Sequence, residues 1–373
     1  MIVGVPREIK TEEYRVAITP IGVRELTDRG HRVVIEAGAG EGSTIHDEEY
    51  GAQGATIVPT AADVFGEADM ILKVKEPQVS EVEMFREGQI LFTYLHLAAY
   101  PELAAGLAKR GIVAIAYETV QRPDGSLPLL APMSEIAGRM APQAGAYFLE
   151  KSQGGRGILL GGVAGVSPAK VVIVGGGIAG SNAAVIAMGM QGDVVVLDTD
   201  SRKMRSIDSL YLGRVVTLHS NKLTIEEQVL DADLVIGTVL VPGAAAPKLV
   251  TEDMVKSMKR GAVLVDVAID QGGCFATSKE TTHSNPVYEL HDVLHYAVGN
   301  IPGAVPHTST YALTNATLRY LVRMAHDGID KALIAHPELQ SGINLVGDQV
   351  CHPGVAESLG VTHVAPMEAI ATL

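Results

Sequence analysis

One stretch of this chain, Val171–Gly180, constrains its fold more than any other. Its first part, VVIV, has the composition of a buried strand, and the cluster GGGIAG follows at once. A run of small residues suited to a helix comes next, and a second apolar run, DVVVLD, ends on Asp198. A strand, a glycine-rich turn, a helix and a second strand ending on an acid form the dinucleotide-binding unit of doubly wound α/β folds.

The glycines of this stretch match the G-x-G-x-x-G pattern, and each has a physical role. Gly175 would form the tight turn, Gly177 would let the backbone approach a pyrophosphate, and Gly180 would let the helix pack closely on the strand. The pyrophosphate would lie at the N-terminus of the helix that starts near Ile178, where free N–H groups and the helix dipole favour an anion. Asp198 lies eighteen residues beyond Gly180, close to the usual spacing of the acid that binds the adenosine ribose.

The acid at Asp198 also bears on the choice of cofactor. A carboxylate at that position would repel the 2′-phosphate of NADP, so the sequence favours NAD. Arg202 and Lys203 lie close by and carry the opposite charge. The alternative interpretation is that they are solvated residues at the start of the next helix.

Length and composition narrow the class of protein. The 373 residues exceed one ordinary domain and predict two, with 47% hydrophobic residues to build the cores. The net charge of −14 argues against nucleic acid and anionic membrane surfaces as partners. Two cysteines supply no disulfide framework, and the opening MIVGVPREIK lacks the pattern of a secretory signal, so we expect a cytoplasmic protein. No apolar run reaches the length of a membrane span without a charge or a glycine.

Segments typical of strands and of helices alternate along the chain, which predicts parallel sheets. Ile2–Val5 has the pattern of a first strand, and Thr19 and Pro20 supply an N-cap and an N1 proline for a helix ending near Gly30. Further strands are predicted over 32–35, 70–74, 89–95, 112–117, 214–218, 232–237 and 262–269, and helices near 60–65, 80–86 and 101–110.

Two longer helices are also predicted. From Ser134, apolar residues recur at every fourth position as far as Phe148, and Pro142 within this stretch predicts a kink or a break. The second helix would cover about 311–324, with Ser309 as its N-cap.

These helices flank the nucleotide unit, which suggests a discontinuous arrangement. Residues 1–130 and 305–373 would form one domain, with an NAD-binding domain of 131–304 inserted between them and a cleft where the two meet. The predicted fold class is therefore α/β, with a Rossmann-type doubly wound nucleotide domain inserted into a discontinuous α/β substrate domain.

The first domain offers three candidates for binding and catalysis. Arg15 could bind a carboxylate with both arms of its guanidinium, although a surface salt bridge with Glu12 or Glu13 is the simpler interpretation. Lys73 and Lys75 alternate along an apolar strand, and burial would lower a lysine pKa. The alternative is a half-exposed edge strand.

His96 is the third candidate, because it closes the apolar run QILFTYLH. The carboxyl end of a buried strand is where α/β sites form, and imidazole titrates near neutral pH. A hydrogen-bonded structural histidine remains the alternative. In the nucleotide half, the run Ala262–Ile269 would deliver Asp270 to the cofactor edge of the sheet, and Asn300 would reach the same rim. Asp266, which we expect in the middle of that strand, is interpreted as structural.

Two further patterns carry no functional prediction. His291 and His295 imitate a metalloprotease spacing, but the motif lacks the glutamate base and its surroundings are typical of a strand, so no metal site is predicted. Cys274 has no evident histidine partner in the sequence and is interpreted as a buried thiol.

Long segments spread over nearly the whole chain resemble the L-alanine dehydrogenase family. They include GVPREIKTEEYRVAITPIGVREL, LKVKEP, FTYLHLA, LPLLAPMSEIAGRMA, ADLVIGTVLVPGAAAPKLV, VDVAIDQGGC and TSTYALTNAT. The opening motif of that family often carries asparagine before the glutamate, where this chain has Glu12 followed by Glu13.

The resemblance implies NAD-dependent oxidative deamination of L-alanine to pyruvate and ammonium, its reversal, and a homohexamer. It implies that Arg15 and Lys75 bind the substrate and that His96 and Asp270 form the acid/base pair. The implied cofactor contacts are Ser134, Gly175, Gly177, Ile178, Ala179, Gly180, Asp198, Lys203, Ser220, Val239, Leu240, Val267, Asp270 and Asn300. The alternative is the soluble NAD(H)-binding component of a proton-translocating transhydrogenase, which resembles this family in fold.

Overall fold

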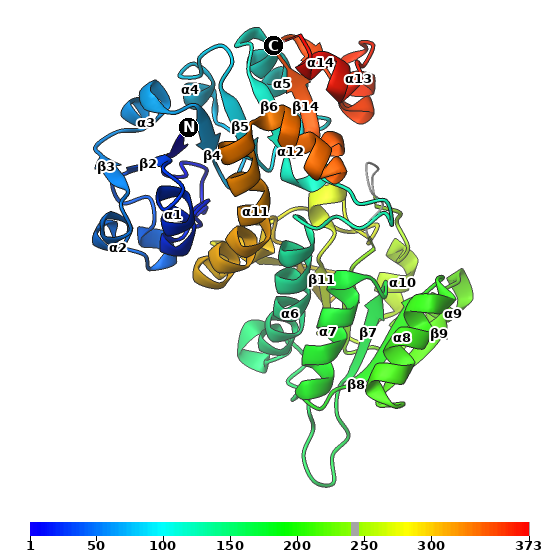
Figure 1. The fold of residues 1–373 in the computed structure, drawn as a ribbon. Coiled ribbons are helices and arrows are strands. Elements are labelled where there is room, and N and C mark those ends of the chain that lie inside the picture. Colours follow the sequence, from blue (N-terminus) through cyan, green and yellow to red (C-terminus); the bar gives the residue numbers. More distant parts are fainter. Residues whose placement is uncertain (240–245, 373) are drawn as a thin grey trace. The chain divides into compact units, whose positions relative to one another are not determined.

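The computed structural model describes residues 1–239 and 246–372, and the chain divides into two compact units. The first unit comprises Met1–Met133 and Val305–Leu373, and the second comprises Ser134–Ala304 (Figure 1). Each contains one largely parallel sheet with helices, so the predicted α/β class with one unit inserted into another is confirmed. Within the described residues, no helix combines the length and the apolar character that crossing a bilayer requires.

The sheet of the first unit has eight strands in the order β15-β14-β6-β5-β4-β1-β2-β3. Strands β1 to β6 run parallel, whereas β14 pairs antiparallel with β6 and with β15. Strand order reverses between β1 and β4, and ligands bind at such a reversal, beyond the carboxyl ends of the strands. The strands are β1 (Ile2–Val5), β2 (Arg32–Glu36), β3 (Thr56–Val58), β4 (Met70–Leu72), β5 (Ile90–Thr93), β6 (Val113–Ala116), β14 (Ile343–Val346) and β15 (Gln349–Val350).

The helices of this unit are short, with one exception. They are α1 (Pro20–Thr27), α2 (Asp47–Ala52), α3 (Ala61–Glu67), α4 (Val79–Val82), α5 (Pro101–Lys109), α11 (Pro306–Asp327), α12 (Ile329–Ala335), α13 (Pro353–Leu359) and α14 (Pro366–Ile370). Thr19 and Pro20 do begin α1, but the helix ends at Thr27 and not near Gly30. The sequence analysis missed several short elements of this unit, among them β3, which has only three residues, and α2, whose sequence DEEYGA is mostly polar.

The sheet of the second unit has seven strands in the order β12-β13-β11-β10-β7-β8-β9, with only β12 antiparallel. Its strands are β7 (Lys170–Val174), β8 (Asp193–Asp198), β9 (Val215–His219), β10 (Leu234–Gly237), β11 (Val263–Asp266), β12 (Val287–Leu290) and β13 (Val293–Tyr296). Its helices are α7 (Ile178–Gly189), α8 (Ser201–Tyr211), α9 (Lys222–Leu230) and α10 (Glu252–Ser257), and α6 (Ala131–Phe148) begins at the unit boundary. Strand order reverses between β7 and β10, which is the dinucleotide crevice of this topology.

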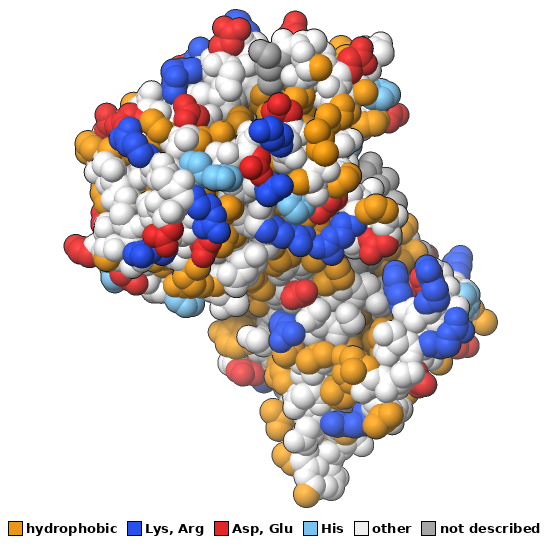
Figure 2. Space-filling model, in the orientation of Figure 1, with side chains coloured by type: hydrophobic (Ala, Val, Ile, Leu, Met, Phe, Trp, Pro, Cys, Tyr) orange, Lys and Arg blue, Asp and Glu red, His pale blue; other side chains and the backbone are white. Residues whose placement is uncertain are grey.

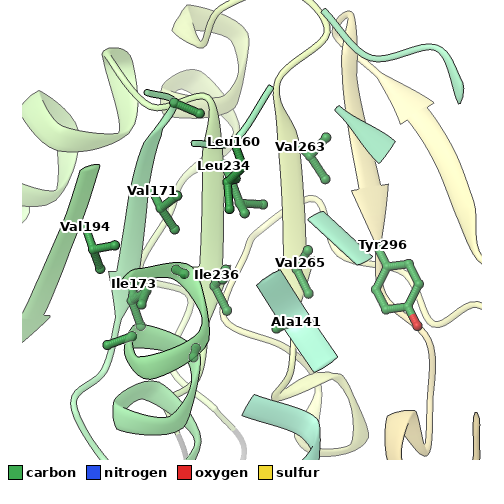
Figure 3. Close-up of a cluster of buried hydrophobic side chains, with 14 of the residues drawn as sticks. Ala141, Leu160, Val171, Ile173, Val194, Leu234, Ile236, Val263, Val265 and Tyr296 are labelled. Carbon is green, nitrogen blue, oxygen red and sulfur yellow. The ribbon is translucent and has the colours of Figure 1, made fainter. Parts of the chain in front are cut away.

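Alternate residues of β7 enter two hydrophobic cores, one on each face of this sheet. Val171 and Ile173 pack into the core shown in Figure 3, to which α6 contributes Ala141, while Val172 and Val174 belong to the core on the opposite face. A strand buried on both faces has a continuous apolar sequence, which explains the run VVIV.

Two helices differ from the sequence predictions. Helix α6 continues from Ala131 to Phe148 through Pro142, so of the predicted kink or break the break does not occur. Helix α11 begins at Pro306, so Ser309 lies inside it, is fully buried, and is not its N-cap. Proline at the first helical position set this start, because its missing N–H and fixed φ suit that place.

Candidate functional site

The turn after β7 has the geometry that its glycines predicted. Gly175 adopts φ +106°, and a Cβ there would approach the Thr238 hydroxyl to 2.8 Å. A Cβ on Gly180 would lie 1.8 Å from the carbonyl oxygen of Gly175, so only glycine fits where α7 meets the turn. These contacts hold the N-terminus of α7 directly beyond the end of β7.

The middle of the turn is open. Apart from its chain neighbours, no atom of the described residues lies within 4 Å of the position that a Cβ on Gly177 would occupy, and Gly177 is the N-cap residue of α7. Ile178 and Ala179 follow in the first turn of the helix, and Ile178 is 42% exposed. The free N–H groups of α7 therefore face an open position, which fits a dinucleotide pyrophosphate.

Asp198 stands at the end of β8, next to this turn, and its side chain is already oriented by backbone groups. Its Oδ2 accepts a hydrogen bond from the Gly176 N–H at 2.7 Å, and its Oδ1 accepts one from the Asp200 N–H at 2.7 Å. The Ser220 N–H donates to the Asp198 carbonyl, which places Ser220 at the neighbouring strand end. The arrangement fits the ribose-binding role predicted for Asp198.

The two cations after Asp198 differ in their surroundings. The Arg202 side chain is 86% exposed and pairs with Asp200, which matches the interpretation of a solvated charge at a helix start. The Lys203 ammonium instead lies 3.6 Å from Oδ2 of Asp198. Figure 2 shows Lys and Arg side chains gathered over α8 and β9, the elements beside this carboxylate.

Thr238, which the sequence analysis missed, helps to form the floor of the crevice. Its hydroxyl donates to the carbonyl of Val174 at 3.1 Å and lies 2.9 Å from that of Gly175. The sequence feature that could have identified Thr238 is its position immediately after the apolar run of β10. Val239 follows it at the same rim and is partly exposed. Leu240, a predicted cofactor contact, lies outside the described residues.

Asp270 and Asn300 lie together, as predicted. The Asn300 N–H donates to Oδ1 of Asp270 at 3.2 Å. The predicted strand was too long, however, because β11 ends at Asp266 and Asp270 lies in a 3-10 turn, Ile269–Gln271. Val267 directly follows the end of β11, and its N–H donates a hydrogen bond to the Gly237 carbonyl.

Asp266 is structural, although it stands at the end of β11 and not in its middle. It is 1% exposed and accepts hydrogen bonds from the N–H groups of Ala268 and Cys274. Cys274 is a buried thiol, as interpreted, and burial raises its pKa to about 12. The pattern around His291 is a turn followed by β13, and not a helix.

In the first unit, Arg15 is buried and not at the surface. Only 2% of it is exposed, its Nε donates to Oε1 of Glu13 at 2.7 Å, and its Nη1 lies 3.1 Å from the sulfur of Met133. Burial alone would raise the pKa of Glu13, but the charge and hydrogen bonds of Arg15 outweigh it and lower that pKa to about 2. Of the two partners that the sequence offered, Glu12 or Glu13, the structure shows the pair with Glu13, and the predicted surface position was wrong.

The lysine pair lies beyond β4, which ends at Leu72 and is flanked by β1 and β5, so the edge-strand interpretation was wrong. Lys73 is 1% exposed and bonds to Glu8 at 2.9 Å and to Glu81 at 2.8 Å. Burial alone would lower its pKa, but these two carboxylates raise it, so Lys73 is charged and structural.

Lys75 is the more accessible of the two lysines, since it is only partly buried. Oε1 of Glu8 accepts hydrogen bonds from the N–H groups of Val74 and Lys75, at 2.5 Å and 3.3 Å. Glu8 therefore connects the buried Lys73 to the backbone that carries Lys75. The sequence analysis missed Glu8, which lies in the loop after β1.

His96 lies in a turn beyond β5, which ends at Thr93. Its φ is +51°, and 39% of its side chain is exposed. Glu118 accepts hydrogen bonds from the N–H groups of both Leu95 and His96, and its nearer carboxylate oxygen lies 3.8 Å from the His96 Nδ1. Lys75, His96 and Glu118 thus follow the carboxyl ends of three neighbouring strands, β4, β5 and β6.

Ser134, another predicted cofactor contact, lies in the first turn of α6 and is partly buried. It is the first residue of the second unit. In the same helix, a Cβ on Gly138 would lie 2.2 Å from the carbonyl oxygen of Ala179, so α6 packs tightly against the start of α7.

Comparison with known proteins identifies the family. The family models described as Alanine dehydrogenase/PNT, N-terminal domain, and Alanine dehydrogenase/PNT, C-terminal domain, match residues 4–137 and 141–353. The chain belongs to the alanine dehydrogenase/PNT family.

Among curated members, an alanine dehydrogenase of Methanococcus maripaludis is 58% identical over 96% of each chain. A solved L-alanine dehydrogenase superposes with a TM-score of 0.93 at 49% identity and covers 96% of this chain and 99% of its own. A transhydrogenase from Sinorhizobium meliloti reaches a TM-score of 0.81 at 28% identity, over 95% of this chain and 99% of its own. Similarity to named alanine dehydrogenases is thus much higher than similarity to the transhydrogenase.

Proposed function

We propose that this chain is an NAD-dependent L-alanine dehydrogenase, which oxidatively deaminates L-alanine to pyruvate and ammonium and catalyses the reverse amination. The observation that carries the proposal is the 58% identity, over 96% of both chains, to a protein named alanine dehydrogenase. Two groups of residues are consistent with this chemistry. The second unit contains the glycine turn with Asp198, and the first unit contains Arg15, Lys75 and His96.

The two units divide the work in this proposal. The second unit holds NAD through the open N-terminus of α7, Asp198 and the rim formed by Thr238, Val239 and Asn300. The first unit binds the amino acid, with Arg15 and Lys75 as contacts for the substrate carboxylate and oxygen. When bound, NAD supplies the acceptor for the hydride that leaves the alanine Cα.

The remaining steps move protons. His96 takes a proton from the water that adds to the imine carbon and returns it to the nitrogen. The carbinolamine hydroxyl then gives its own proton to His96 as the carbonyl forms and ammonia leaves. Lys75 stabilises the charge on the oxygen as the carbinolamine forms and collapses. Asp270 assists the proton transfer. Arg15 fixes the carboxylate, so that the reacting carbon is held in one orientation.

Two further properties belong to the proposal. We infer a homohexamer from the resemblance to the family, and a cytoplasmic location from the two cysteines, both of which are free and buried. The partners are small molecules, namely L-alanine, pyruvate and ammonium, with no nucleic acid and no membrane.

The test is the change in NADH absorbance when purified protein is mixed with NAD and L-alanine, with NADP and D-alanine as controls. Pyruvate, ammonium and NADH test the reverse direction. Turnover with NAD and L-alanine only would support the proposal, and His96→Ala should then abolish turnover while NADH still binds. NADH binding without alanine-dependent or pyruvate-dependent turnover would favour the transhydrogenase component instead.

A further inference from the structure

The turn that carries His96 is held in an unusual backbone conformation. At φ +51°, His96 occupies the left-handed region, which side chains with a Cβ adopt at an energetic cost. A loop would relax out of this conformation unless neighbouring groups held it there. Within the described residues, the side chain that contacts the backbone N–H groups of this turn is Glu118.

Glu118 contacts two successive N–H groups of the turn. Its Oε1 accepts from the His96 N–H at 2.6 Å, and its Oε2 accepts from the Leu95 N–H at 3.2 Å. Hydrogen bonds to an ionised carboxylate are about twice as strong as bonds between neutral groups. These bonds fix both peptide planes that precede the imidazole, and so fix the direction in which the ring leaves the backbone.

Glu118 is itself held in place by the sheet. Strands β5 and β6 pair in parallel with Thr93 opposite Ala116, so the residues that follow each strand also lie side by side. Tyr117, fully buried, packs edge-on against Phe92 at 4.4 Å and Tyr94 at 5.0 Å between ring centroids. The carboxylate is therefore a fixed element to which the His96 turn is attached.

We propose that Glu118 is a positioning residue that holds the His96 turn in its left-handed conformation and aims the imidazole for proton transfer. The proposal rests on the proposed function, because it requires His96 to act in catalysis. The side chain of Glu118 is only 11% exposed, whereas that of His96 is 39% exposed. The carboxylate therefore acts from behind the turn, and the ring remains accessible to a substrate.

The test compares Glu118→Ala and Glu118→Gln with the wild-type enzyme, in kcat, in KM for L-alanine and in the Kd of NADH. The alanine variant removes the acceptor, and we expect kcat to fall by roughly 100-fold, the usual consequence of misplacing a reacting group by about 1 Å. KM and the Kd of NADH should change little. The glutamine variant keeps an oxygen that accepts the two N–H groups, so its kcat should lie between the other two.

A matched control lies in the same sheet, directly before β4, at the amino end of that strand. Asp69 is an exposed carboxylate that also accepts a backbone hydrogen bond, from the Ile2 N–H at 2.7 Å. Asp69→Ala should leave kcat unchanged. If Glu118→Ala does not fold, Glu118→Gln replaces it. Its kcat should then fall by more than twofold while KM and the Kd of NADH change little, and a kcat within twofold of wild type would overturn the positioning role.

Three outcomes would count against specific claims. A kcat of Glu118→Ala and Glu118→Gln within twofold of wild type, with His96→Ala inactive, would overturn the positioning role and leave the proposed function standing. An equal loss of kcat, substrate affinity and NADH binding in Glu118→Ala would show a merely structural role and would also overturn it. Full activity of His96→Ala would instead overturn the catalytic role of His96 in the proposed function.

Discussion

Acid should destabilise this protein through His295, which lies in β13 and is 1% exposed. Its Nδ1 lies 3.0 Å from the Val293 carbonyl and must donate to it, and its Nε2 lies 2.8 Å from the Thr277 hydroxyl. Burial lowers the pKa of the ring from 6.5 to about 4, so at neutral pH the ring is neutral and its Nε2 accepts from that hydroxyl. Tyr288 stacks on the ring with centroids 4.8 Å apart, and the nearby His291 adds a smaller effect in the same direction.

The sign of the effect follows from proton binding. Between pH 6.5 and 4 the unfolded chain protonates this histidine and the folded chain does not, so the free energy of unfolding decreases as the pH falls. A shift from 6.5 to about 4 corresponds to about 3.4 kcal/mol over the whole window. Between pH 7.5 and pH 5 the expected loss is about 2 kcal/mol.

The assay is urea unfolding at pH 7.5, 6, 5 and 4.5, followed by circular dichroism because the chain has no tryptophan. The His295→Gln variant should lose about 2 kcal/mol less than wild type between pH 7.5 and 5, whatever its stability at pH 7.5. Other acid-sensitive groups, such as the partly buried His352, affect both proteins equally. Parallel pH profiles for wild type and variant would refute the reasoning.

Three further predictions follow from positions already described. Gly180→Ala places a Cβ 1.8 Å from a backbone oxygen and should abolish NADH binding measured by fluorescence. Gly189→Ala in the same helix should leave it intact, because among the described residues no atom outside the helix backbone lies within 4 Å of its Cβ position. Glu12 has φ +60°, so Glu12→Asn should raise the free energy of unfolding in urea by about 1 kcal/mol, and a destabilised variant would contradict this. Lys73→Met leaves two buried carboxylates without their cation, so the free energy of unfolding in urea should fall by about 3–5 kcal/mol. A fall of less than about 1 kcal/mol would mean that these ion pairs contribute no more than a surface salt bridge.

The nucleotide unit could be predicted from the sequence because its determinants are close together along the chain. A buried strand, the glycine turn and the next strand span Val171 to Asp198 without interruption. Each glycine has a local steric reason, which the structure bears out at Gly175 and Gly180. Length errors arose where an apolar run outlasts its strand, as in the run that continues past Asp266, because apolar residues also fill the turn that follows.

The first unit was harder to predict, since its interactions join residues far apart in the sequence. Arg15 is two residues from its partner, but only the folded unit buries the pair and brings Met133 against it. Lys73 meets Glu8 across 65 positions, and that contact decides that Lys73 is structural and charged. Alternation along one strand could not separate the roles of Lys73 and Lys75, because both lysines lie beyond the strand.

One arrangement recurs in both sheets and explains why the turns beyond β4, β5 and β7 are held in place. In a parallel sheet, the backbone of a strand that has just ended still presents N–H groups that the neighbouring strand no longer bonds. A carboxylate at the end of the neighbouring strand, or just beyond it, can accept them. In each case here, the N–H is that of the second residue beyond a strand end: Val74 bonds to Glu8, Leu95 to Glu118, and Gly176 to Asp198.

The three acids share this geometry, and the turns that they hold lead to Lys75, to His96 and to the glycines beneath the predicted pyrophosphate position. An acid at the end of a neighbouring strand is therefore a signal that sequence could offer, provided that the strand order is known. Strand order is a property of the whole sheet and is not encoded in any one segment. For that reason Asp198, whose partner strand is adjacent in sequence, could be predicted, whereas Glu8, 64 positions before the end of its partner strand at Leu72, could not.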